Sequence, residues 1–184
     1  MSKLSRGHKG EEEAISLLCT INRYHHLIND VTFVNAKSEM THQIDHILIH
    51  PYGVFVIETK NYFGTIEVDS EGFWYKTIKH VRSKINNPLL QNKSHAINLY
   101  RLLNREYDVI PVVVFVKNNA PYLPNDNVIN LCALLEFIES YPYKRLYQEK
   151  TLDKIKEIIT SKVSIVDNKE HLENIKYYKQ ITFS

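Results

Sequence analysis

Two neighbouring apolar runs each carry charged groups near one end. The run at 43–50 (QIDHILIH) holds Asp45, and the run at 54–60 (VFVIETK) changes from apolar residues to Glu58 and Lys60. Alternation along a strand places Glu58 and Lys60 on one face. A strand of this kind brings a carboxylate and an ammonium from a buried core to the edge of a pocket.

The segment between these runs decides whether their acids can meet. Residues 51–53 (PYG) have turn chemistry and are short enough to close a hairpin. Antiparallel pairing about Tyr52 would place Asp45 beside Glu58. Their two carboxylates could then share one cation.

This arrangement suits phosphodiester hydrolysis with Mg²⁺, and we expect Mn²⁺ to substitute for it. Mg²⁺ binds one or two carboxylates, keeps several waters and takes its remaining ligands from substrate phosphate. A bound cation lowers the pKa of water and neutralises developing negative charge. Lys60 could hold the scissile phosphate or steady the attacking water.

Two expected helices supply further candidates for this site. Glu11 is the first choice for a third carboxylate, with Glu12 and Glu13 as rivals. Gln91 and His95, one helical turn apart, could face the same cleft.

A basic stretch follows the third expected strand and is a candidate for contacts with backbone phosphates. A solvated surface is the alternative interpretation. The candidate nucleic-acid contacts are Lys60, Lys76, Lys79, Arg82, Lys84 and His95.

The catalytic candidates could instead have purely structural roles. Asp45 and the Glu58–Lys60 pair could form a surface ion pair, and acids at the start of a helix are favoured by its dipole. Histidines at 42, 46 and 50 would indicate a metal site on a helix, but their surroundings predict a strand, which does not favour zinc.

The composition is that of a soluble globular protein. The chain has 184 residues, of which 43% are hydrophobic and 24% charged, and its net charge of +2 permits a polyanionic partner without requiring one. The five glycines form no G-x-G-x-x-G, P-loop or G-x-S-x-G motif. The sequence signatures of three large enzyme classes are therefore missing.

The sequence indicates a cytoplasmic protein without a membrane segment. Cys19 and Cys132 lie in apolar helical patterns, which predicts two buried thiols in a reducing compartment. No apolar run approaches the roughly 20 residues of a membrane span. The first residues lack the apolar stretch of a signal peptide.

The order of expected elements predicts an α/β fold with a mixed sheet. Helix, three strands, helix and strand follow one another, and no repeat or long linker divides the chain. We expect helices at 10–24, 88–104, 132–139 and 151–161, a further helix in the tail after Asp167, and strands at 31–35, 43–50, 54–60, 65–68, 73–78, 109–116 and 128–130.

Taken together, three stretches resemble the nuclease-related domain (NERD) family of the PD-(D/E)xK nuclease superfamily. They are GHKGEEEAISLL, QIDHILIHPYGVFVIETKNYFGTIEV and NPLLQNKSHAINL, and PVVVFV extends the likeness to residue 116. The resemblance implies a restriction-endonuclease-like αβββαβ core at 7–116, with a mixed central sheet flanked by helices. Residues 117–184 would add a mainly helical C-terminal part to a single domain spanning 1–184.

The resemblance also implies roles for individual residues. Asp45 takes the place of the superfamily's metal-binding aspartate, with Glu58 and Lys60 as the (D/E)-x-K pair. Glu11 matches the acid of the first helix. Gln91 matches the glutamine of a Q-x-x-x-Y motif, although histidine stands four residues later in this chain.

The implied activity is Mg²⁺-dependent hydrolysis of DNA in processing, repair or defence. DNA is favoured over RNA as the partner, although no base-reading motif decides between them. A homodimer is expected by analogy, because nucleases of this superfamily often pair two sites to cut both strands. The alternative is a nucleic-acid-binding or assembly module that keeps the fold with little or no catalysis.

Overall fold

The computed structural model describes residues 3–34, 41–123, 126–162 and 164–165, with side chains described at 7–32, 43–123 and 126–162. Its helices are α1 (Lys3–Leu18), α2 (Pro88–Leu102), α3 (Leu134–Glu139) and α4 (Glu149–Lys162), with a 3₁₀ turn η1 (Leu131–Ala133) before α3. Its strands are β1 (His26–Val34), β2 (Thr41–His50), β3 (Gly53–Lys60), β4 (Thr65–Val68), β5 (Trp74–Ile78), β6 (Val81–Ile85), β7 (Val109–Phe115), β8 (Val128–Asn130) and β9 (Ser164–Ile165).

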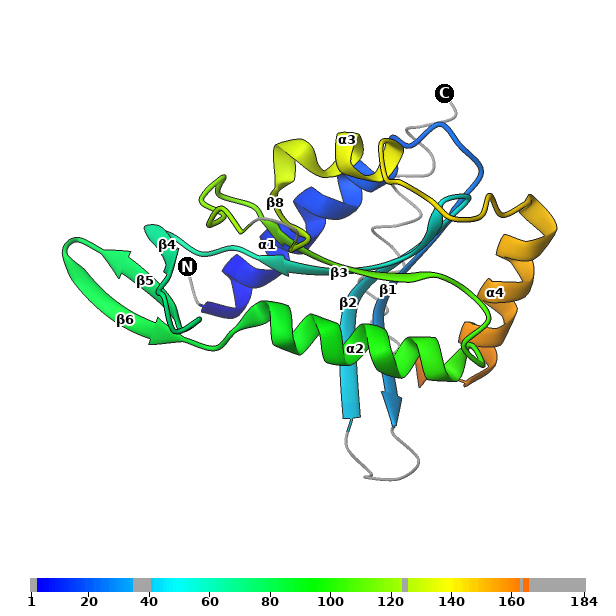
Figure 1. Cartoon of the computed structure of the whole chain (residues 1–184), viewed down its shortest axis with the longest axis horizontal. Coiled ribbons are helices and arrows are strands. Elements are labelled where there is room, and N and C mark those ends of the chain that lie inside the picture. Colours follow the sequence, from blue (N-terminus) through cyan, green and yellow to red (C-terminus); the bar gives the residue numbers. More distant parts are fainter. Residues whose placement is uncertain (1–2, 35–40, 124–125, 163, 166–184) are drawn as a thin grey trace.

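A mixed sheet with the order β8-β7-β3-β2-β1-β9 forms the middle layer. Strands β1, β2 and β3 pair antiparallel, whereas β7 joins β3 in parallel through the α2 crossover. Helices α1 and α3 cover one face of the sheet, and α2 and α4 lie on the other (Figure 1). The predicted α/β fold with an αβββαβ core is confirmed.

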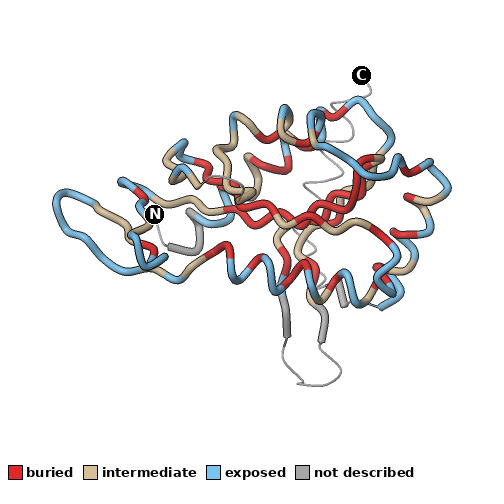
Figure 2. Tube along the Cα trace, viewed as in Figure 1, coloured by how far each residue is buried: buried red, intermediate tan, exposed pale blue. Residues whose placement is uncertain are grey.

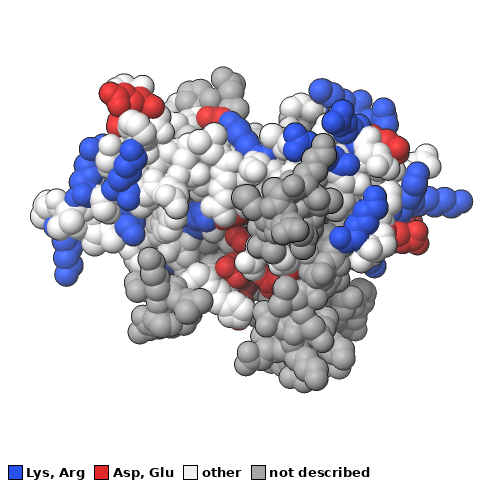
Figure 3. Space-filling model, turned by 90° about the horizontal axis from the view of Figure 1, so that it is seen from below, with Lys and Arg blue, Asp and Glu red and all other residues white. Residues whose placement is uncertain are grey.

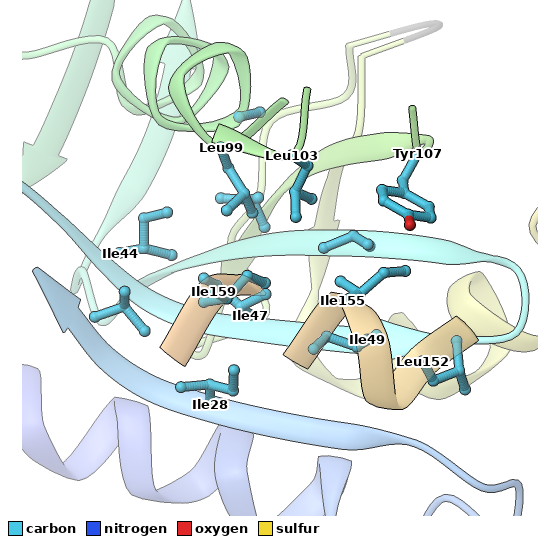
Figure 4. Close-up of a cluster of buried hydrophobic side chains, with 14 of the residues drawn as sticks. Ile28, Ile44, Ile47, Ile49, Leu99, Leu103, Tyr107, Leu152, Ile155 and Ile159 are labelled. Carbon is cyan, nitrogen blue, oxygen red and sulfur yellow. The ribbon is translucent and has the colours of Figure 1, made fainter. Parts of the chain in front are cut away.

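Strand β3 lies at the centre of the sheet and is buried almost to its end, as Figure 2 shows. Val54 and Val56 pack in a cluster with residues of α2 and α4 (Figure 4). Phe55 and Ile57 pack in a second cluster, with residues of α1 and α3. This alternation puts Glu58 on the same side of the sheet as α2.

Side-chain hydrogen bonds of Asn87 and Asn92 hold the start of α2 in place. The Asn87 side chain accepts from the amides of Leu89 and Leu90 and caps the helix. One turn later, the fully buried Asn92 donates to the carbonyls of Val56 (2.9 Å) and Val112 (2.8 Å). These bonds tie α2 to both β3 and β7 and fix its first turns beside the end of β3.

A second sheet, made of β4, β5 and β6, projects beyond the end of the main sheet (Figure 1). We call residues 65–85 the arm. Trp74 anchors the arm because its buried ring stacks on Phe115 of β7 with 6.2 Å between centroids. Strand β6 was not expected from the sequence, which indicated only a basic stretch there.

Helix α1 differs from the prediction at both ends. It begins at Lys3 and ends at Leu18, so Glu11, Glu12 and Glu13 lie in its middle. They are therefore not in the first turn, where the helix dipole would have explained them. Strand β1 begins at His26, five residues before the expected strand.

Two further expectations need comment. Cys19 and Cys132 are exposed, so the prediction of buried thiols is wrong, although they form no disulfide with each other. The expected helix after Asp167 lies outside the described residues, and the single domain over 1–184 stays a prediction. Across the described ranges, no helix is both long and apolar enough to cross a membrane.

Candidate active site

The backbone pairing of β2 with β3 ends next to Asp45 and Glu58. Backbone pairing ends at His46 and Ile57. Beyond that pair, the Thr59 amide donates to Asp45 Oδ2 (2.9 Å) and the Thr59 hydroxyl donates to the same oxygen (3.1 Å). The Asp45 carboxylate thus takes the place of a strand carbonyl, and charged acceptors make strong hydrogen bonds. The expected meeting of the two strand ends is confirmed, with Thr59 as an additional partner.

Glu58 is held at the end of β3 by groups from two elements. It is only 4% exposed, and its Oε1 accepts a hydrogen bond from the Lys60 ammonium. The same oxygen accepts from Gln91 Nε2 at 3.2 Å. The structure therefore brings Gln91 to the Glu58–Lys60 pair, as the sequence predicted.

The electrostatics of this pair follow from its burial. Burial of Glu58, followed by the nearby charge of Asp45, raises the pKa of Glu58 to about 7. Burial alone would lower the pKa of Lys60, but the adjacent Glu58 outweighs it and the pKa of Lys60 lies above its ordinary value. Lys60 is therefore a cation at neutral pH and cannot serve as a proton acceptor.

Glu11 is the acid of α1 whose pKa is affected by the charge of Asp45. Its burial, followed by the charges of Asp45 and Asp30, raises the pKa of Glu11 above its ordinary value. Glu12 and Glu13 instead line an open depression of about 730 Å³. Of the three acids, Glu11 is therefore the best candidate for the third carboxylate of the site.

Asp30 is a site residue that the sequence reasoning missed. The register pairs Asn29 with His46 and Val31 with Ile44, so Asp30 lies opposite Asp45. Its φ of 52° is left-handed, which is uncommon for a residue in a strand. The available signal was an aspartate within an otherwise β-type run, because aspartate is depleted in strands.

The approach of α1 to the site depends on Gly10. A Cβ at this position would lie 2.9 Å from Asn61 Cβ and 3.2 Å from Val116 Cγ2. Contacts this short require neighbouring atoms to move. The missing side chain therefore lets α1 come close to the end of β3 and places Glu11 near Asp45.

We expect Gly10→Ala to lower the free energy of unfolding by about 1–3 kcal/mol through overpacking. Gly7→Ala is the matched control on the same helix, since its Cβ would lie 3.9 Å from Glu11 Oε1, in ordinary contact. The control should stabilise the protein by up to about 1 kcal/mol. Urea unfolding measures both variants, and equal stabilities would contradict the close approach of α1.

The buried histidines His46 and His95 are not among the groups joined to the Glu58–Lys60 pair by hydrogen bonds. His95 is 7% exposed, which argues against the expected contact of its side chain with nucleic acid. His46 Nδ1 lies 2.8 Å from Asn29 Oδ1, and the His42 side chain lies outside the described residues. In the part of the chain whose side chains are described, no three His, Cys, Asp or Glu residues are gathered closely enough to hold a metal ion as they stand.

The lowered pKa of the buried His50 leads us to expect that the stability of the protein depends on pH. Burial lowers the pKa of His50 to about 4, although the charge of Glu139 opposes this shift. A folded-state pKa below that of the unfolded chain stabilises the protein at pH values above about 6.5. This contribution is lost as the pH falls from about 6.5 to 4.

We therefore expect wild-type protein to lose up to about 3 kcal/mol more stability than His50→Asn over that pH range. Asparagine can still accept the hydrogen bond that the Tyr52 amide makes to His50 Nδ1. Urea unfolding at several pH values compares the two proteins. Parallel pH profiles would show that His50 is not held neutral by its surroundings.

Comparisons with known proteins identify the family of this chain. The family model described as the nuclease-related domain matches residues 6–116. An uncharacterized protein of Bacillus anthracis is 28% identical to this chain, over 94% of the chain and 83% of its own length. No solved structure matches the chain. Because the family model covers more than half of the sequence, from α1 to the end of β7, the chain belongs to the nuclease-related domain family.

Proposed function

We propose that the protein is a metal-dependent nuclease that hydrolyses phosphodiester bonds of DNA in the cytoplasm, in processing, repair or defence. The observation that supports this most is the joining of Glu58, Lys60 and Gln91 by hydrogen bonds next to Asp45. These groups come from two strand ends and one helix. Their chemical types are those that phosphoryl transfer requires.

The donor groups fit Mg²⁺, or Mn²⁺ in its place. Asp45 and Glu58 are carboxylates, with Glu11 as the third donor, and hard divalent cations prefer such oxygen ligands. Burial and mutual repulsion raise the pKa of Glu58 and of Glu11. A divalent cation would offset this repulsion. When bound, it would lower the pKa of a water molecule and neutralise charge on the phosphate.

The chain's own residues orient these donors. Thr59 holds Asp45 Oδ2 with two hydrogen bonds, so the orientation of that carboxylate is set before any ligand arrives. Gln91 and Lys60 do the same for Glu58. Lys60 also supplies a fixed positive charge that can stabilise the charge that develops on the scissile phosphate.

The uneven distribution of charge along the sequence supports a polyanionic substrate. Residues 72–105 contain no acid, whereas the whole chain has 23 Lys and Arg against 21 Asp and Glu, so the rest of the chain is net acidic. We propose DNA as the substrate and, by analogy with other nucleases, a homodimer as the assembly. The cations of this segment are Lys76, Lys79, Arg82, Lys84, Lys93, Arg101 and Arg105.

A substrate panel tests the proposal. Purified protein is incubated with labelled single-stranded, double-stranded and branched DNA and with RNA, in Mg²⁺, Mn²⁺ or EDTA. Cleavage of DNA that requires the metal and disappears in Lys60→Ala protein is the expected result. Preferential cleavage of RNA would contradict the substrate, and cleavage in EDTA would contradict the metal requirement.

A binding or assembly module without catalysis is the second candidate. It is favoured by the absence, among the described side chains, of three metal-binding residues already gathered together. It is favoured also by the ammonium of Lys60 that already neutralises Glu58. Tight binding of nucleic acid with no cleavage under any condition of the panel would select this function.

A further inference from the structure

The arm carries an exposed basic surface that the proposed chemistry does not use. Strands β5 and β6 pair so that Tyr75 lies opposite Lys84 and Thr77 lies opposite Arg82. Alternation puts these residues on the face opposite to the buried Trp74. The outer face of the arm therefore carries these cations and Tyr75, together with Glu67 of β4, which lies opposite Tyr75 and 3.9 Å from Arg82.

The outer cations are held over aromatic rings. The Arg82 guanidinium lies 3.5 Å from the Tyr75 ring centroid, and the Lys84 ammonium lies 3.3 Å from that of Phe73. Contacts of this kind orient a long side chain before it meets a partner. They also cover the exposed ring of Phe73, which leaves that ring face unavailable for stacking on an unpaired base.

The tip of the arm has a strained turn and an exposed apolar pair. Lys79 and His80 form the two-residue turn between β5 and β6, with φ values of 45° and 68°. Such a turn ordinarily prefers Asn-Gly, because both positions are left-handed. Beside it, Ile78 (40% exposed) and Val81 (69% exposed) pair across the strands. The tip thus presents two branched apolar side chains next to two basic residues.

The arm is joined directly to the candidate active site. Strand β6 ends at Ile85, and α2 begins three residues later at Pro88. The first turn of α2 holds Gln91, which donates to Glu58. In Figure 3 the acidic groups gather near the middle of the face, and Lys and Arg side chains lie on both sides of them, over the arm on the left and at the opposite end on the right. A nucleic acid that is bound at the acids and spans this face would reach the arm.

We propose that the arm inserts its tip into a groove of duplex DNA beside the scissile phosphate. Lys79, Arg82 and Lys84 would bind phosphates on the edges of the groove, and Ile78 and Val81 would press on sugars and base edges. Apolar side chains flanked by cations are the groups that proteins use to enter a groove. This inference rests on the proposed function for its position on the substrate, but it concerns binding alone.

The observations favour a duplex over a single strand as the partner. Single-strand binding relies on open aromatic faces on which bases stack. On the outer face of the arm, cations lie over the rings of Tyr75 and Phe73. Only the tip of the β5–β6 hairpin, with the Ile78–Val81 pair and its turn, extends beyond β4, and a two-stranded ribbon has a size that a groove admits.

Two arm variants separate phosphate contact from groove entry. Lys79→Asn/His80→Gly removes a cation and supplies the turn pair that favours this conformation, so folding should not suffer. Ile78→Thr/Val81→Thr keeps branched side chains and removes apolar surface. Lys9→Gln is the control, since it removes one cation from the depression beside Glu12. Binding to a labelled duplex and to a single strand of equal length is measured in EDTA over a range of salt concentrations.

The expected results differ between the variants. Lys79→Asn/His80→Gly should weaken duplex binding by about tenfold and reduce the slope of log affinity against log salt by about 1. Ile78→Thr/Val81→Thr should weaken duplex binding with an unchanged slope, and its single-strand affinity should stay that of wild type. Lys9→Gln should bind as wild type.

Two outcomes would overturn the inference. Either both arm variants bind the duplex like Lys9→Gln protein, or only Lys79→Asn/His80→Gly loses affinity, which would leave phosphate contact without groove entry. Because the assay contains no metal, its result is independent of cleavage. A protein that binds through the arm but never cuts would refute the proposed function alone.

Discussion

Asp45→Asn protein is expected to lose metal-dependent cleavage by at least about 100-fold and yet to unfold at a higher temperature than wild type at neutral pH. Asparagine can still accept both hydrogen bonds from Thr59 through its oxygen. The substitution therefore keeps the geometry of the strand ends and removes only the negative charge. Loss of that charge removes a proposed metal ligand and also a source of repulsion in the folded protein.

The direction of the stability change follows from Glu58. Its pKa of about 7 lies above its ordinary value, so the charged form destabilises the fold as the pH rises toward neutrality. Asp45 contributes to this shift, after burial. A fall of one unit in the pKa of Glu58 would stabilise the metal-free protein by about 1 kcal/mol at pH 7, where the acid is half ionised at the outset, and by about 1.4 kcal/mol at higher pH.

Thr59→Val is the matched control for this prediction. It removes the hydroxyl bond to Asp45 but keeps the amide bond and the charge. We expect a smaller loss of activity, about tenfold, without a rise in melting temperature. Initial cleavage rates and thermal unfolding without metal are measured for the three proteins. An Asp45→Asn protein that is active, or that unfolds at a lower temperature than wild type, would assign Asp45 a structural role.

Cleavage is expected to increase with pH through about 7 when the metal is well below saturation. Glu58 must lose its proton to bind a cation, and its pKa in the metal-free protein is about 7. Higher metal concentrations should move the midpoint to lower pH, because the metal competes with the proton. The rate is measured from pH 5.5 to 8.5 at two concentrations of Mg²⁺.

Lys60→Met should move the same midpoint to higher pH and lower the maximal rate by at least about 100-fold. The ammonium of Lys60 lowers the pKa of Glu58, so its removal favours the protonated acid. Lys60→Arg keeps a positive charge and should hold the midpoint near that of wild type. A midpoint that is the same in all three proteins would show that Glu58 is not the group whose titration limits the rate.

The placement of the main acids could be predicted because it depends on strand periodicity. Alternation on β3 sets the faces of Glu58 and Lys60, and the short turn of Pro51 and Tyr52 sets which residues of β2 they meet. These features are local, so a short stretch of sequence is enough to specify them. Gln91 is different, because its contact with Glu58 joins residues 33 apart, and its prediction depended on the resemblance to the Q-x-x-x-Y motif.

Other features depend on contacts that are distant in sequence. Asn92 is a polar residue in a helix and would be assigned to the surface, but it lies over two strands and donates to both. Strand β6 is exposed along four of its five residues, so it has no alternating pattern to detect. Asp30 is placed in the site by pairing with β2, which the sequence alone does not reveal.

Binding of Mn²⁺ tests most directly the claim that Asp45 and Glu58 hold a divalent cation. Free Mn²⁺ is followed by electron paramagnetic resonance in titrations of wild-type, Asp45→Asn and Glu58→Gln protein at pH 8. We predict one site in wild type that both variants lose while they remain folded. Binding of equal strength in all three proteins would place the metal elsewhere, and no binding in wild type would contradict the proposed metal-dependent mechanism.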